Sequence, residues 1–62
     1  MTEDEAKREA LRLALLEVGW VLAGWDPANV AWQFQHHDGA RVLITAETLL
    51  EAMRILLVQV GD

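Results

Sequence analysis

The centre of the chain carries two short runs in which apolar and polar residues alternate. They span residues 30–35 and 40–45, and His37-Asp38-Gly39 lies between them. Alternation with a period of two predicts strands that bury one face, and Asp-Gly between two such runs is typical of a tight turn. The pattern therefore predicts a β-hairpin over residues 30–45.

The length of the turn decides which side chains share a face of this hairpin. A two-residue loop at Asp38-Gly39 would divide the apolar residues between both faces. A three-residue loop, with Gly39 in a left-handed bulge position, collects them on one face. We therefore expect Phe34 opposite Val42 and Trp32 opposite Ile44. The apolar face would hold Val30, Trp32, Phe34, Val42 and Ile44, and the other face Gln33, Gln35, Arg41, Leu43 and Thr45.

Helical patterns flank the hairpin on both sides. Thr2 followed by Glu5 is a capping-box signature, a broad apolar arc follows it, and Gly19 is typical of a residue just past a helix end. These signals predict a helix over about 3–18. Thr45 or Thr48 caps a second helix, which we expect over about 46–60 and which Gly61 follows.

The segment between the first helix and the hairpin fits either a buried helix or a strand. It reads Trp20-Val21-Leu22-Ala23-Gly24-Trp25, and a helix through its glycines would lose about 1 kcal/mol at each. A strand over 20–25 is therefore favoured, with a turn at 26–29. The whole chain, residues 1–62, is predicted to be a single α+β domain of order α-β-β-β-α. Its antiparallel sheet would carry both helices on one face.

The chain has more apolar residues than a domain of its size is able to bury. Of its 62 residues, 53% are hydrophobic and three are tryptophan, whereas so short a chain hides only about 60% of its unfolded surface. Trp20 and Trp25 differ in parity, so a regular strand would send them to opposite faces and expose one. We expect self-association or a protein partner. The candidate interface residues are Trp20, Trp25, Leu43, Ile55 and Val58.

Charge restricts the class of partner. The formal net charge is −5, with ten acidic residues against five basic ones, whereas nucleic-acid binders draw most of their affinity from Lys and Arg. Direct binding to nucleic acid or to a membrane is therefore disfavoured. The acidic start differs from a signal peptide, and the apolar runs are shorter than the roughly 18 residues of a membrane span. Cysteine is absent, so we expect a soluble cytoplasmic protein without disulfides.

The sequence offers little catalytic chemistry. Ser, Cys and Tyr are absent, which removes most nucleophiles, and no phosphate-binding glycine loop is present. His36-His37-Asp38 is the one cluster with acid–base or metal-binding side chains, but neighbouring residues of a strand point to opposite faces. We interpret it as a polar hairpin tip in which Asp38 stabilises its own turn. We expect no catalytic residue, no metal site and no cofactor.

Two segments carry a resemblance to a known family. The chain resembles the HicA-type toxins over roughly residues 10 to 60, both in the order of its elements and in two segments. These segments are Val18-Gly19-Trp20-Val21-Leu22 and Phe34-Gln35-His36-His37-Asp38-Gly39-Ala40-Arg41-Val42. The resemblance implies a double-stranded-RNA-binding-domain-like fold and mRNA cleavage. However, the family's catalytic His, in a Gly-Ser-His motif entering the second strand, corresponds to Ala31 here. The family's basic surface and its polar insertion before the last helix are also missing, so the resemblance favours the fold and not the activity.

Three functions follow from these patterns. The leading one is a non-enzymatic interaction module that works as a homodimer, through 49–60 or an outer sheet face around Trp25 and Leu43. The second is a small acidic inhibitor or antitoxin-like protein that occupies a basic nucleic-acid-binding surface. The third is a HicA-like ribonuclease with a relocated catalytic His, such as His36. The carboxylates proposed for the second function are Glu3, Asp4, Glu5, Glu9 and Glu17.

Overall fold

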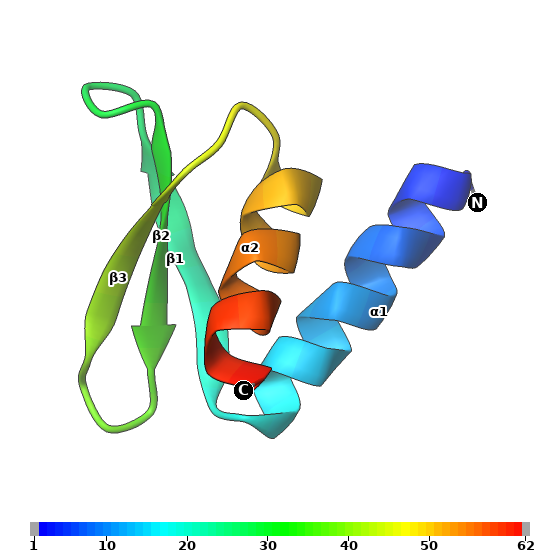
Figure 1. The fold of residues 1–62 in the computed structure, drawn as a ribbon, viewed down its shortest axis with the longest axis horizontal. Coiled ribbons are helices and arrows are strands. Elements are labelled where there is room, and N and C mark those ends of the chain that lie inside the picture. The colour runs from blue at the N-terminus through cyan, green and yellow to red at the C-terminus, as the bar shows by residue number, and fades with distance from the viewer. Residues whose placement is uncertain (1, 62) are drawn as a thin grey trace.

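Five elements follow one another along the chain in the expected order. The computed structural model describes residues 2–61. The elements are α1 (Glu3–Glu17), β1 (Trp20–Asp26), β2 (Ala31–His36), β3 (Arg41–Thr45) and α2 (Leu49–Gly61). The strands form one antiparallel sheet in the order β1-β2-β3, and both helices lie on the same face of it (Figure 1). The predicted α+β class is confirmed.

The central hairpin has the predicted register. Phe34 lies opposite Val42 and Trp32 opposite Ile44. Gly39 has a φ of +99°, a left-handed conformation that glycine adopts without a steric penalty. Phe34 and Ile44 are buried, so the apolar face of the hairpin forms one wall of the core.

The first helix begins and ends as its sequence signals indicate. The Thr2 hydroxyl accepts a hydrogen bond from the Glu5 backbone N–H (3.2 Å), which satisfies one of the free donors at a helix start. After Glu17, the last residue of α1, the chain turns away at Gly19, whose φ is +90° and whose N–H donates to the Leu16 carbonyl (3.0 Å). The predicted cap and stop are both confirmed.

The second helix begins at Leu49, three residues later than expected. Ala46 is buried, and its N–H donates to the Val30 carbonyl (3.3 Å), so it stays tied to the sheet. Thr48 is the cap, because its hydroxyl accepts from the Glu51 N–H (3.2 Å). Of the two candidate caps, the sheet contact therefore rules out the earlier one.

The prediction that Val30 belongs to the apolar hairpin face is wrong. β2 begins at Ala31, and Val30 lies in the preceding turn with a φ of +47° and 48% of its surface exposed. The Asp26 carboxylate closes this turn by accepting from the Ala28 N–H (3.1 Å) and the Asn29 amide (2.8 Å). The last turn residue must then adopt a left-handed conformation, which is costly for a β-branched side chain.

A β-bulge in β1 corrects the expected placement of the tryptophans. The register to β2 shifts by one residue between Leu22 and Gly24, so Ala23 is the extra residue. The expectation of opposite faces assumed a regular strand. The extra residue restores the parity of Trp20 and Trp25, and both lie on the face that carries the helices.

The core lies between the hairpin and the two helices. α2 packs against β2, β3 and α1, whereas α1 packs against α2 and β1 (Figure 1). Toward its N-terminus, α1 diverges from the sheet, and residues 2–10 are all exposed. The core is therefore closed over β2 and β3 but thin over β1. Its buried residues are Leu15, Phe34, Ile44, Ala46, Ala52, Met53 and Leu56.

Relief of the backbone strain at Val30 should stabilise the fold. We expect Val30→Asn to raise the free energy of unfolding by about 1 kcal/mol, because Asn tolerates the left-handed region better than a β-branched residue. Urea denaturation followed by circular dichroism measures the change. The matched control is Leu43→Asn, at a strand position exposed to a similar extent (47%), which should lower stability. An equal loss in both variants would contradict the strain at Val30.

Candidate interaction surface

The residues predicted to form an interface do not lie together. Trp25 lies opposite Trp32 on the helix-bearing face, whereas Leu43 lies opposite Gln33 on the other face. The predicted outer patch around Trp25 and Leu43 is therefore wrong, because the bulge turns Trp25 toward the helices. Three of the candidates are exposed, namely Trp25, Leu43 and Val58, and two are partly buried against the core, namely Trp20 and Ile55.

A different group of apolar side chains gathers at the edge of the sheet. β1 is an outermost strand, so its second long side has no strand partner among residues 2–61. Residues 20–25 carry no charge. Large apolar side chains on this strand and at the end of α1 are 43–49% exposed. We call this group the β1-edge surface; it consists of Leu16, Val18, Val21, Leu22 and Trp25.

A groove between α1 and β1 connects this surface to the core. Its apolar part has a volume of about 210 Å³, is lined by Leu16 and Leu22, and reaches the buried residues Phe34 and Met53. A second cavity of about 360 Å³ continues along α1 and is also lined by Leu22 and Met53. The groove follows from the divergence of α1 seen in Figure 1. Leu22 is therefore an apolar side chain that the helices cover only in part, and 45% of its surface is exposed.

Two of the charges beside the groove, Arg12 and Glu9, are paired within α1, and Glu5 and Arg8 line its second cavity as well. Arg12 lines both cavities, and its Nε donates to the Glu9 carboxylate (3.1 Å). This hydrogen bond lowers the pKa of Glu9 and raises the pKa of Arg12. The pair leaves no net charge at this point of the groove, so an apolar partner surface meets no isolated ion there.

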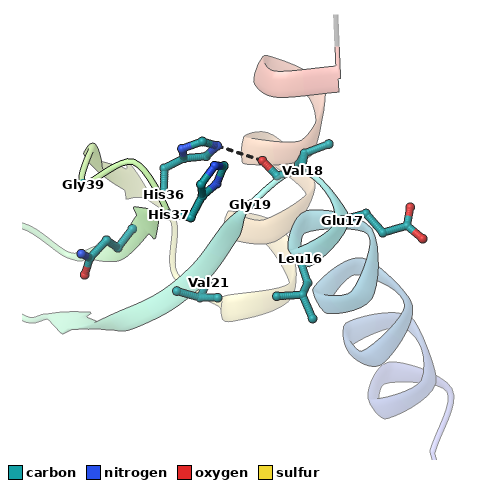
Figure 2. Close-up of a pocket in the computed structure, with 9 residues that line it drawn as sticks. Leu16, Glu17, Val18, Gly19, Val21, His36, His37 and Gly39 are labelled. Atoms are coloured by element: carbon teal, nitrogen blue, oxygen red, sulfur yellow. Dashed lines mark hydrogen bonds between the residues drawn. The ribbon is translucent and has the colours of Figure 1, made fainter.

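The histidine cluster lies where the end of α1 meets the tip of the hairpin (Figure 2). It borders a pocket of about 780 Å³. The rings of His36 and His37 lie side by side, with centroids 4.1 Å apart. His36 Nε2 is 2.9 Å from the Val18 carbonyl oxygen, and its Nδ1 is 3.0 Å from an oxygen of Asp38. The His36 ring therefore joins α1 to the hairpin turn.

Gly19 is the point of closest approach in this cluster. The His37 backbone N–H donates to the Gly19 carbonyl (2.9 Å). A Cβ atom on Gly19 would lie 2.2 Å from His37 Nδ1 and 2.8 Å from His36 Nε2. Only glycine fits here, both because of its positive φ and because the two imidazole rings occupy the space of a side chain.

The geometry of the cluster favours a structural role over a chemical one. A carbonyl oxygen only accepts, so His36 Nε2 must keep its proton and is not free to act as a base. Among residues 2–61, no three His, Cys, Asp or Glu side chains are placed to hold a metal ion. Ala31, which the resemblance aligns with a catalytic His, is 1% exposed.

The predicted role of Asp38 in its own turn is confirmed. Its carboxylate accepts from the Ala40 N–H (2.8 Å). This hydrogen bond, followed by the one to His36, lowers the pKa of Asp38. Sequence reasoning missed the contact of His36 with Val18, since the two residues are 18 positions apart and no local pattern connects them.

Comparisons of the chain with protein-family models, curated proteins and solved structures found no match. Within residues 2–61, neither helix has the length and apolar character that a membrane crossing requires. The β1-edge surface and the groove beside it are therefore the candidate interaction site.

Gly19→Ala should weaken the fold far more than Gly24→Ala. We expect the first substitution to cost about 2–4 kcal/mol, because it adds left-handed strain to the clash with both imidazoles. At Gly24 a Cβ has no atom within 4 Å, so its cost should stay within about 0.5 kcal/mol. Chemical denaturation of both variants compares them. Equal losses would contradict the close approach at Gly19.

Ionised Asp38 should stabilise the folded chain in a pH-dependent way. Its folded-state pKa is lowered, so its contribution is present above the ordinary Asp pKa of about 3.9 and is lost as pH falls through the folded value. Asp38→Asn should therefore be less stable than the parent near neutral pH, with the difference vanishing in acid. Denaturation from pH 7 to about pH 2 measures this. His36→Gln should retain most of the dependence, because Ala40 supplies the larger effect.

Proposed function

We propose that the protein is a non-enzymatic protein–protein interaction module that works as a homodimer through the β1-edge surface. One observation carries the proposal: an edge strand that is uncharged over residues 20–25 exposes large apolar side chains on both of its faces. Val21 lies on the outer face, and Leu22 and Trp25 lie on the helix-bearing face. An edge strand of this kind offers both unpaired backbone groups and apolar area to another chain.

The size of the chain supports self-association. A standard interface covers about 800 Å² on each partner, which is roughly a fifth of the 4288 Å² that this chain exposes. Burial of half-exposed Leu, Val and Trp side chains contributes stability that a 62-residue core lacks. A second copy of the chain would therefore bury the apolar side chains that the first copy leaves exposed.

The acidic-inhibitor alternative receives less support from the side chains. Two of its five carboxylates are paired within α1, Glu3 with Lys7 (3.2 Å) and Glu9 with Arg12. A carboxylate already paired within its own helix is less available to a basic enzyme surface. The ribonuclease alternative loses one candidate base, because His36 Nε2 faces a carbonyl oxygen.

Sedimentation analysis at micromolar concentration tests the homodimer. The parent should show a concentration-dependent dimer, and Leu22→Lys should weaken it at least about tenfold, because a charge enters the apolar edge. The matched control is Val58→Lys, at an exposed α2 position (68%) outside the β1-edge surface, which should dimerise normally.

Two outcomes would contradict this proposal. A parent that sediments as a monomer at every concentration rules out the homodimer. A dimer lost in Val58→Lys but retained in Leu22→Lys moves the interface to α2, the other surface expected from the sequence. Circular dichroism of each variant shows whether its fold is retained.

A further inference from the structure

We propose that two copies join by antiparallel pairing of their β1 strands around a two-fold axis between Leu22 and Ala23, so that Trp20 of each copy lies opposite Trp25 of the other. This inference rests on the proposed homodimer and specifies its geometry. The product is a continuous six-stranded sheet with all four helices on one face.

The faces of β1 restrict the possible registers. Because of the bulge, Trp20, Leu22 and Trp25 lie on the helix-bearing face, and Val21 and Gly24 lie on the outer face. Directly opposed residues of neighbouring strands share a face, so a register is acceptable only if like faces meet. A two-fold axis adds a second condition, because every residue pair between the two strands must then occur twice, once in each direction.

One register satisfies these conditions over the whole uncharged segment. It sets Trp20 opposite Trp25, Val21 opposite Gly24, and Leu22 opposite the bulged Ala23 of the second copy. A register with Trp20 opposite Leu22 and Val21 opposite itself brings like faces together but pairs residues 20–22 only. The longer alternative sets Leu22 opposite Trp25 and Val21 opposite Asp26. That alternative leaves Trp20 unpaired and places a carboxylate against an apolar side chain, so we favour the first.

The side chains at the edge fit this pairing. Gly24 has no atom within 4 Å of a Cβ position, which leaves open space for Val21 of the second copy. Within each copy, Trp20 already contacts His36 (centroids 4.9 Å) and Trp25 contacts Trp32 (4.8 Å). Pairing of Trp20 with Trp25 would join these contacts into aromatic rows across the two sheets, an arrangement that stabilises strand pairs.

The bulge indicates that the strand which pairs with the free edge of β1 belongs to a second copy of the chain. A bulged edge does not match a regular strand along its full length, because the strand faces change parity at Ala23. A copy related by a two-fold axis carries the same bulge at the same place. The absence of charge in residues 20–25 also means that the two strands bring no like charges together, although the chain carries a net charge of −5.

Disulfide trapping tests this register. The chain has no cysteine, so Val21→Cys and Gly24→Cys can each be introduced alone, and both variants are first shown by sedimentation to dimerise. In an equimolar oxidised mixture, Cys residues at 21 and 24 of different copies should be directly opposed and within disulfide range. We expect at least about fivefold more mixed dimer than either self-linked dimer, because identical positions would lie roughly 10 Å apart.

The outcomes separate this inference from the homodimer itself. Dimers that sediment normally but give only the twofold statistical excess of mixed product would overturn the register and leave the homodimer intact. A monomeric parent overturns both. Val21→Cys mixed with Asp26→Cys reports the alternative register, and preferential linkage there would also overturn ours. If either substitution at 21 or 24 prevents dimerisation, Trp20→Cys mixed with Trp25→Cys reports the same register, because these positions lie far from the two-fold axis and identical residues are too distant to self-link.

Discussion

The close approach at Gly19 is the constraint on which the arrangement of the fold depends. There the end of α1 meets the tip of the hairpin, and the carbonyl groups of Val18 and Gly19 accept hydrogen bonds from the His36 ring and the His37 N–H. These contacts fix α1 at its C-terminal end and place the start of β1 beside the end of β2. No comparable anchor holds the polar N-terminal half of α1 to the sheet, where residues 2–10 are exposed. The helix diverges, and the outer strand of the sheet remains uncovered.

The bulge at Ala23 determines what the uncovered strand presents. Without it, the two tryptophans of β1 would project from opposite faces, and one would stand alone on the outer surface. With it, Trp25 reaches Trp32 and Trp20 reaches His36 on the same face. One extra residue thus moves the aromatic side chains from a scattered arrangement to a row along the sheet edge, beside the groove that α1 leaves open.

The sequence predicted those features that local signals determine. The capping threonines, the glycine after α1 and the single register that keeps the hairpin apolar on one face are all encoded within a few residues. The prediction for Val30 was wrong because the alternating pattern continues into a turn, and the hydrogen bonds of that turn decide the backbone conformation there. The bulge at Ala23 has one mark in the sequence, the isolated glycine that follows it at Gly24. The prediction assumed a regular strand and did not use this mark, so it found the surplus of apolar surface but placed it wrongly. The bond between His36 and Val18 depends on tertiary structure alone.

An exposed apolar edge normally carries the risk of open-ended assembly, and the structure limits that risk to one side of the sheet. The opposite edge is β3, a five-residue strand that begins with Arg41 and ends with Thr45, both exposed. A charged, short edge pairs poorly with another strand. If β1 pairs with β1 of a second copy, the exposed apolar edge of each chain is covered in that one contact. The two-fold symmetry then leaves no apolar edge for a third chain. In this proposed dimer, the same bulge that makes the edge a poor template for regular strands would make it complementary to itself, so the geometry that exposes the apolar side chains would also favour a dimer over a fibre.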